Sequence, residues 1–235
     1  ILIGETMQEN KRIAFIIGGM GRGGAEKVIS IISNHYAEIG WDVDIIMLLN
    51  NKVDYILHPN INLINLSYEN KSRWKSLPYW IKGIRNYIKT KKPTVVVPFA
   101  ARISIISLCA NIGKNVPMII SERNDPKADT RGKFAKIIIP FIYPRADKIV
   151  FQTEYAKKCF NKRIQNLGEI IYNPISVQCF AQEEKTNKIV TIGRLDAQKN
   201  QKMLINAFYN ISKIYKDYIL EIYGEGNLRE ELEKQ

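Results

Sequence analysis

The stretch RIAFIIGGMGRGGAE, from Arg12 to Glu26, decides the fold of this chain. Its first six residues form an apolar run that predicts a buried strand, and five glycines follow between Gly18 and Gly24. Apolar residues at helical spacing then predict a helix over about residues 25–39: Val28, Ile32, Tyr36 and Ile39. Glycines in such a turn let a ligand approach the backbone amides closely. The stretch therefore predicts the first βα unit of the fold, with a loop whose backbone a ligand can approach closely.

Strand and helix signals alternate along the rest of the chain, with short connections. Further strands are expected at Val43–Leu49, Val95–Phe99, Met118–Ser121, Lys148–Phe151, Glu169–Tyr172, Lys188–Ile192 and Ile219–Tyr223. Helices are expected at 73–91, Ile103–Asn111, Gly132–Tyr143 and Glu154–Phe160. Residues 53–66 hold two short extended pieces that form a hairpin or an edge strand. This alternation indicates α/β architecture with parallel, doubly wound sheets.

A polar stretch without periodicity, QCFAQEEKTN (178–187), divides the chain. We expect an N-terminal Rossmann-like domain over residues 1–175, a linker over 176–187 and a second βαβ series over 188–235. The chain does not begin with Met, and the helix that starts near its end stops at Gln235. We therefore expect a fragment whose second domain is incomplete.

The net charge of +12 is unevenly distributed. No Asp or Glu occurs from Asn70 to Ser121, where ten Lys and Arg residues lie. Such a region favours polyanions, anionic lipid or phosphorylated substrates. The three cysteines, Cys109, Cys159 and Cys179, match no metal or redox spacing and indicate a reducing, cytoplasmic setting. No metal site or cofactor is predicted.

A second loop, Gly193 to Asn200 (GRLDAQKN), lies between a predicted strand and a predicted helix. The helix carries apolar residues at spacings of three and four: Met203, Leu204, Ala207, Phe208, Ile211 and Ile214. Arg194 and Lys199 stand at the N-terminus of this helix, where free N–H groups and the helix dipole attract anions. On its own, the loop is either an anion site or a solvated polar turn.

Gly19, Gly21 and Gly24 also satisfy the G-x-G-x-x-G spacing of NAD and FAD sites. Such sites need an acidic residue at the carboxyl end of the second strand, about 20 residues on. Asp42 and Asp44 lie at the beginning of that strand, and Asn50 and Asn51 lie at its end. A nucleotide-dependent oxidoreductase is therefore an alternative, although the acidic residue that would bind the ribose is missing from the end of the second strand.

An ordered set of short motifs resembles the retaining glycosyltransferases of family 4, of GT-B fold. The motifs are Gly23-Gly24-Ala25-Glu26, Tyr172-Asn173-Pro174-Ile175, Gly193-Arg194-Leu195 with Lys199-Asn200, Leu204-Ile205-Asn206-Ala207-Phe208, and Ile222-Tyr223-Gly224-Glu225-Gly226 with Leu228-Arg229. The resemblance covers the chain from Lys11 onward. It implies two Rossmann-like domains, the first for an acceptor and the second for a nucleotide-sugar donor.

The resemblance also implies roles for particular residues. Arg194 and Lys199 match the pair that neutralises the donor diphosphate, beside Gly193, and they are the candidate catalytic residues. Gly23 and Gly24 match glycines whose amides approach donor phosphate or acceptor, and Glu26 follows them. Fixed cations would stabilise the leaving diphosphate without a metal.

Two departures from the family pattern stand out. Where many members carry a histidine, this chain reads Ser121-Glu122-Arg123-Asn124, so Glu122, Arg123 and Asn124 are candidate residues lining the cleft. The paired glutamates that hold the donor sugar in the family would lie beyond Gln235. The resemblance therefore implies that the chain as given is inactive.

Residues 71–92 combine eight cations with Trp74, Tyr79 and Trp80. Leu77, Ile81, Ile84 and Ile88 follow helical spacing, which a helix packed on the sheet explains. The aromatic and cationic residues instead favour contact with an anionic membrane surface. Nucleic acid would use the same residue types, but no nucleic-acid-binding module is recognisable.

Together these features predict a glycosyltransferase that moves a hexose or N-acetylhexosamine from a UDP-sugar to a lipid-linked or other membrane-associated glycan. Transfer would retain configuration, and the protein would act from the cytoplasmic face of the cell membrane. A basic fragment that binds membranes or polyanions without turnover is the remaining alternative.

Overall fold

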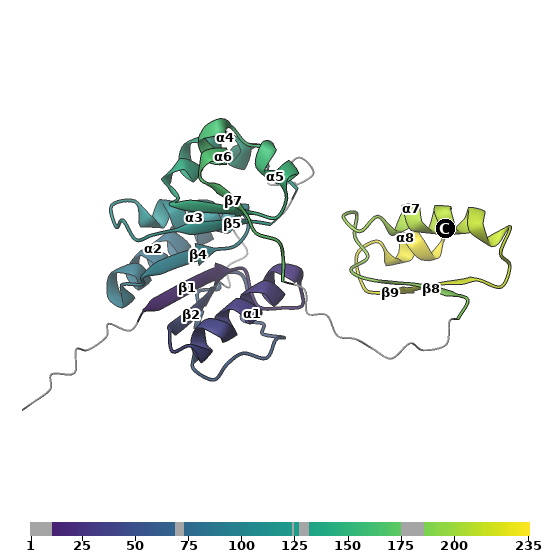
Figure 1. Ribbon diagram of the computed structural model, residues 1–235, viewed down its shortest axis with the longest axis horizontal. Helices are drawn as coiled ribbons and strands as arrows, with labels where there is room; N and C mark the ends of the chain where they lie inside the picture. Colours follow the sequence, from purple (N-terminus) through teal and green to yellow (C-terminus); the bar gives the residue numbers. More distant parts are fainter. Residues whose placement is uncertain (1–10, 69–72, 124, 127–131, 175–185) are drawn as a thin grey trace, which may run out of the picture. The chain divides into compact units, whose positions relative to one another are not determined.

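In the computed structural model the chain divides into two units, unit 1 (residues 1–175) and unit 2 (176–235). The structure describes residues 11–68, 73–123, 125–126, 132–174 and 186–235, without the side chains of 73–75, 133 and 134. The expected linker therefore lies almost wholly outside the described residues. Figure 1 shows the elements of each unit.

Unit 1 is built on parallel strands in the order β3-β2-β1-β4 and β5-β6-β7. The strands are β1 (Arg12–Ile17), β2 (Asp42–Met47), β3 (Ile61–Asn65), β4 (Val95–Pro98), β5 (Ile119–Glu122), β6 (Lys148–Phe151) and β7 (Gly168–Ile170). Parallel bridges from Val96 to Met118 and from Phe99 to Ser121 join β4 to β5. The result is the doubly wound arrangement that the alternating pattern predicts.

Helices cover both faces of this sheet. They are α1 (Gly24–Glu38), α2 (Arg73–Lys91), α3 (Ala101–Asn111), α4 (Gly132–Ile142), the 3₁₀ helix η1 (Tyr143–Arg145), α5 (Glu154–Lys158) and α6 (Lys162–Asn166). Alternate residues of β1 explain the two cores. Phe15 packs in the cluster that includes α1, whereas Ile16 packs in the larger cluster that includes α2, α3 and α4. Burial on both faces is the reason why β1 is almost continuously apolar.

Of the two alternatives for residues 53–66, the edge strand is the one observed, because β3 pairs in parallel with β2 at the edge of the sheet. Two other local expectations need correction. The helix expected at 154–160 ends at Lys158, and α6 follows it with its own cap, since the Asn161 side chain accepts from the N–H of Ile164. Trp80 of α2 belongs to the core, with 7% of its surface exposed.

Unit 2 contains the parallel pair β8 (Lys188–Ile192) and β9 (Ile219–Tyr223), with α7 (Gln201–Ser212) and α8 (Arg229–Glu233). The better-buried face of α7 coincides only in part with the expected stripe. Gln201, Leu204 and Phe208 are more buried than Met203, Ala207 and Ile211, which are exposed. Both stripes have helical spacing, so the pattern of apolar residues alone could not choose between them.

Candidate functional site

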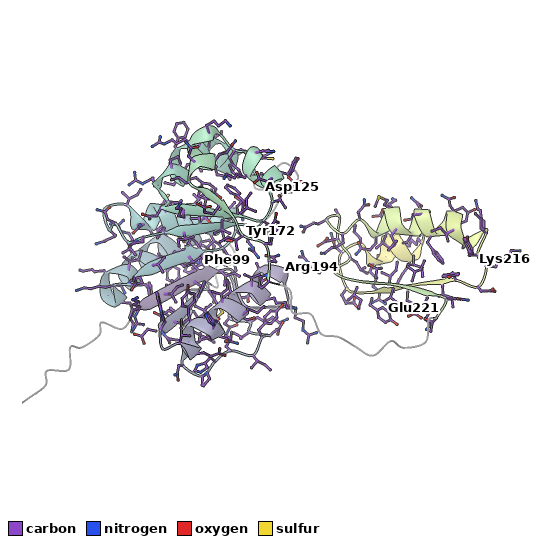
Figure 2. The ribbon with its side chains drawn as sticks, in the orientation of Figure 1. Phe99, Asp125, Tyr172, Arg194, Lys216 and Glu221 are labelled. Atoms are coloured by element: carbon purple, nitrogen blue, oxygen red, sulfur yellow. The ribbon has the colours of Figure 1, made fainter. Side chains whose placement is uncertain are left out.

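The strand order of unit 1 reverses between β1 and β4, which are neighbours in the sheet. Ligands of doubly wound sheets bind outside the carboxyl ends of the strands at such a point. The glycine-rich loop follows β1 here and Phe99 follows β4, with its N–H donating to the carbonyl of Ile16 at 2.9 Å. Figure 2 labels Phe99 at this edge. The edge is the candidate site of unit 1.

Residues 49–55 hold the glycine-rich loop in place. The N–H of Met20 donates to the carbonyl of Lys52 at 2.8 Å, and the N–H of Asp54 donates back to the carbonyl of Met20 at 2.9 Å. The side chain of Asn50 fills the space that a Cβ of Gly19 would need. Part of the glycine content is therefore explained by packing between two loops rather than by a ligand.

Gly23 and Gly24 differ in their surroundings. The Glu26 carboxylate folds back over Gly23 and fills the position of its absent side chain, whereas nothing lies within 4 Å of a Cβ built on Gly24. Gly23 is the N-cap residue of α1 and makes no side-chain capping bond. The first-turn N–H groups of α1 have no acceptor within the helix, so this end suits an anion. The donor-binding role of both glycines stays a prediction.

Sequence reasoning missed Tyr55. Its hydroxyl donates to the carbonyl of Gly23 at 2.8 Å and lies 3.3 Å from the N–H of the same residue. No local sequence signal identifies it, because Tyr55 lies 32 residues from its partner in an irregular segment.

Arg123 is a cation at this edge, directly after β5. Its guanidinium lies 5.2 Å from the ring centroid of Phe99, and its Nη2 donates to Oδ1 of Asn173 at 2.5 Å. Burial lowers the pKa of Arg123, and the charge of Glu26 opposes that shift. The side-chain amide of Gln152 also contacts that of Asn173. The ends of β4, β5, β6 and β7 thus bring together groups from distant parts of the sequence.

The other two candidates for the cleft lining are Glu122 and Asn124. Glu122 is only 2% exposed and accepts a hydrogen bond from the hydroxyl of Tyr143 at 2.8 Å, so it faces the core of unit 1. The expectation that it lines an open cleft is wrong for unit 1, since alternate residues of a strand point to opposite faces. Asn124 lies outside the described residues.

Backbone strain marks the same edge. Ala100, between β4 and α3, has φ 71° and ψ 148°, in a region that is almost confined to glycine. Its N–H donates to the carbonyl of Ser121 at 3.0 Å, and its carbonyl accepts from Ser104 at 2.9 Å. Strained residues of this kind cluster at ligand sites.

In unit 2, the loop after β8 carries the predicted anion-binding pair. The Arg194 side chain is 69% exposed, with its Nη2 3.4 Å from Asp196. The stem of Lys199 lies across Gly193, with its Cδ 3.8 Å from a Cβ built there. Buried Gln201 donates to the carbonyl of Arg194 at 2.8 Å. Both cations thus extend from one braced loop.

Gly224 and Gly226 explain how this loop is braced. A Cβ on Gly224 would overlap the carbonyl oxygen of Gly193, and one on Gly226 would overlap that of Leu195. The N–H of Leu195 donates to the carbonyl of Glu225 at 2.9 Å. The two loops therefore pack backbone against backbone, and glycine is required at both positions.

The acidic residues of β2 lie at the opposite edge of unit 1 from the glycine-rich loop. Asp44 is fully buried and binds Arg12 Nη1 at 2.9 Å, Asn62 Nδ2 at 2.9 Å and the Tyr87 hydroxyl at 2.5 Å. The network ties β1, β2, β3 and α2 together. A ribose-binding role for Asp44 is thereby excluded, as its place at the start of the strand predicts.

Two units on parallel sheets, each with a glycine-containing loop at a strand end, are typical of proteins of GT-B fold. The chain belongs to Glycosyltransferase Family 4, whose family model matches residues 22–178. Residues 177–235 match the model of the glycosyl transferases group 1. The family resemblance predicted from the motifs is confirmed.

Two similar proteins come from Campylobacter jejuni. The GalNAc-α-(1→4)-GalNAc-α-(1→3)-diNAcBac-PP-undecaprenol α-1,4-N-acetyl-D-galactosaminyltransferase is 27% identical, over 94% of this chain and 64% of its own length. The N-acetylgalactosamine-N,N'-diacetylbacillosaminyl-diphospho-undecaprenol 4-α-N-acetylgalactosaminyltransferase is 26% identical, over 94% of this chain and 65% of its own. The chain thus spans just under two thirds of these relatives.

Solved structures share the fold at low sequence identity. HepE of Anabaena, in complex with UDP and glucose, superimposes with a TM-score of 0.75 at 12% identity, over 96% of this chain and 64% of its own. The lipopolysaccharide outer core galactosyltransferase WaaB gives 0.63 at 17%, over 95% and 71%. UDP-N-acetylglucosamine 2-epimerase from Rickettsia bellii gives 0.59 at 13%, over 96% and 65%. Since an epimerase shares the fold, the fold alone does not identify the reaction.

Proposed function

We propose that the protein transfers an N-acetylhexosamine or a hexose from a UDP-sugar to a lipid-linked glycan, with retention of configuration. The observation that carries the proposal is the placement of Arg194 and Lys199 on one braced loop at the N-terminus of α7. The names of the Campylobacter relatives, which specify diphospho-undecaprenol acceptors, support the acceptor class.

The chemistry of the loop suits a departing diphosphate. Cleavage of the sugar–phosphate bond leaves negative charge on the diphosphate, and preorganised cations stabilise that charge as it develops. Arg194 and Lys199 can supply this stabilisation without a metal. The Gly24 end of α1 and Arg123 would contact acceptor or donor in unit 1. Attack from the face of the leaving group would retain configuration and needs no nucleophilic side chain.

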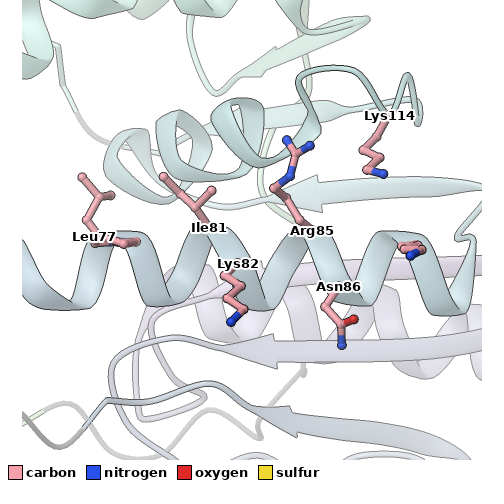
Figure 3. A pocket seen from close by; sticks show the side chains of 8 residues that line it. Leu77, Ile81, Lys82, Arg85, Asn86 and Lys114 are labelled. Atoms are coloured by element: carbon pink, nitrogen blue, oxygen red, sulfur yellow. The ribbon is translucent and has the colours of Figure 1, made fainter.

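We further propose that the protein acts peripherally at the inner face of the cell membrane, with α2 contacting anionic lipid. Lys82 and Lys89 are exposed on α2 and line a shallow groove of about 600 Å³, together with Leu77, Ile81 and Lys114 (Figure 3). Arg85 also lines it, although its Nη1 donates to the carbonyl oxygens of Ala110 and Ile112. None of the helices in the described part of the chain is long and apolar enough to cross a bilayer.

Titration of the intact protein tests the donor. We expect UDP-GalNAc, UDP-GlcNAc or UDP-glucose to bind and NAD to fail. Arg194→Gln and Lys199→Gln should each weaken binding by about 10- to 150-fold, the loss of one charged hydrogen bond. Lys213→Gln, at the other end of α7, is the matched control. Binding of NAD alone, or unchanged donor affinity in both variants, would refute the proposal.

Transfer is tested with a glycan on polyprenyl diphosphate, and the anomeric configuration of the product is read by NMR. An inverted linkage would contradict the retaining mechanism. Turnover that survives complete removal of divalent cations is the expected result for a metal-independent transferase.

A further inference from the structure

The outer face of α4 carries exposed apolar residues that its packing does not explain. Ile137 is 67% exposed and Phe141 is 76% exposed, one helical turn apart. The opposite face of α4 is buried in the core through Ala135, Ile139 and Ile142. A helix that is apolar on both sides is normally buried on both sides.

Neighbouring helices frame this face with positive charge. In unit 1, α3 packs against both α2 and α4, and the three form one layer on the sheet (Figure 1). None of their residues is Asp or Glu. The exposed cations among the described side chains of the layer and its ends are Lys82, Lys89, Lys91, Lys92, Arg102, Lys114, Lys136 and Arg145.

The most exposed large apolar side chains of this layer lie on α4 rather than on α2. Trp80, Ile84 and Ile88 of α2 are at most 7% exposed. Among the described side chains of the three helices, the large apolar ones that are more than half exposed are Ile137 and Phe141. The apolar groups available for insertion therefore lie on α4, whereas most of the exposed cations lie on α2 and α3 or at the ends of the helices.

We propose that Ile137 and Phe141 insert into an anionic bilayer while the cations of α2, α3 and α4 contact its headgroups. Burial of two large apolar side chains and attraction of several cations to anionic lipid are the two terms that hold an interfacial helix on a membrane. This inference rests on the proposed function in one respect, the presence of a membrane-bound acceptor.

Vesicle flotation of the intact protein tests the inference. Vesicles of phosphatidylglycerol and phosphatidylethanolamine in equal parts should bind the protein, vesicles of phosphatidylcholine alone should bind it weakly, and added salt should weaken binding. The double variant Ile137→Ser/Phe141→Ser should lose at least tenfold in partitioning. Ile39→Ser/Ile56→Ser, which alters exposed isoleucines at the end of α1 and in the loop before β3, is the matched control and should bind normally.

A second measurement reports insertion directly. Phe141→Trp should add a blue-shifted emission on anionic vesicles that brominated lipid quenches, relative to the unsubstituted protein. Equal vesicle binding by the double variant and the unsubstituted protein, or a Phe141→Trp emission that brominated lipid leaves unchanged, would overturn the inference. So would a double variant whose only change is a lower oligomeric state, because the face would then join two copies.

Hydrolysis of UDP-sugar without vesicles separates the inference from the proposed function. We expect the double variant to retain this hydrolysis. If the unsubstituted protein binds vesicles through α4 but neither binds nor hydrolyses nucleotide sugars, the proposed function fails and the inference about α4 stands.

Discussion

The Tyr55 hydroxyl donates to the carbonyl oxygen of Gly23 at 2.8 Å and accepts from the Gly23 N–H at 3.3 Å. One side chain thus fixes both backbone polar groups of the N-cap residue of α1. The glycine-rich loop is held from outside, by a segment that follows β2, rather than by its own sequence. Its amides are therefore positioned before any ligand binds.

Removal of this hydroxyl should loosen the loop without removing the ring. We expect Tyr55→Phe to lower the free energy of unfolding by about 1 kcal/mol, the net worth of a typical hydrogen bond. KM for donor or acceptor should rise several-fold. Tyr215→Phe, on an exposed tyrosine of unit 2, serves as the control. Unchanged kinetics in Tyr55→Phe would show that the loop holds its shape without the hydroxyl.

Stability should fall at alkaline pH because of Tyr87. Burial, followed by the hydrogen bond and charge of Asp44, raises the pKa of Tyr87 well above its ordinary value. The unfolded tyrosine loses its proton near pH 10, whereas the folded one keeps it, so the native state binds more protons above that pH. The contribution is fully present below about pH 10 and is lost above it, at about 1.4 kcal/mol per pH unit.

Tyr87→Phe tests this linkage. The variant should be less stable at pH 7, by about 1–3 kcal/mol, because buried Asp44 loses a hydrogen-bond donor. The gap between the variant and the unsubstituted protein should narrow as the pH rises above about 10. Urea unfolding at several pH values measures both, and a gap that stays constant would argue against the linkage.

The strain at Ala100 predicts a stabilising substitution. Because its φ of 71° suits glycine, Ala100→Gly should raise the free energy of unfolding by about 1 kcal/mol. Ala101→Gly, one residue later in α3, should lower it by about the same amount, since glycine is unfavourable within a helix. Thermal unfolding of the two variants compares the signs directly.

Arg123 should act through the geometry of its guanidinium as well as through its charge. Arg123→Lys keeps the charge but loses the planar group that stacks on Phe99 and reaches Asn173. We expect kcat/KM to fall roughly tenfold or more in both Arg123→Lys and Arg123→Gln, the effect of about 1.4 kcal/mol. Arg163→Gln, an exposed arginine on α6, is the control. Full activity in Arg123→Lys would show that the site needs only the positive charge at this position and not the planar guanidinium.

The predicted elements agree closely with the observed strands and helices of both units, because period and glycine placement are local signals. The sequence left alternatives open where several arrangements satisfy the same pattern. Residues 53–66 allow a hairpin or an edge strand, of which the edge strand is observed. On α7 only part of the predicted apolar stripe lies on the better-buried face. Trp80 looked like a surface aromatic beside cations, but its Nε1 donates to the carbonyl of Leu66 at 3.1 Å within the core.

The sequence by itself determined the α/β class, the two-part organisation and the family, and it predicts Arg194 and Lys199 as the anion-binding pair. These depend on residues that are close together in the chain, where spacing has a direct structural meaning. Only the tertiary structure decided that Tyr55 holds Gly23, that Arg123 meets Phe99 and Asn173, that Glu122 faces the core and that α4 exposes Ile137 and Phe141. The physical reason is that these relationships join carboxyl ends of strands and helix faces whose mutual positions depend on sheet order and packing, which no local pattern records.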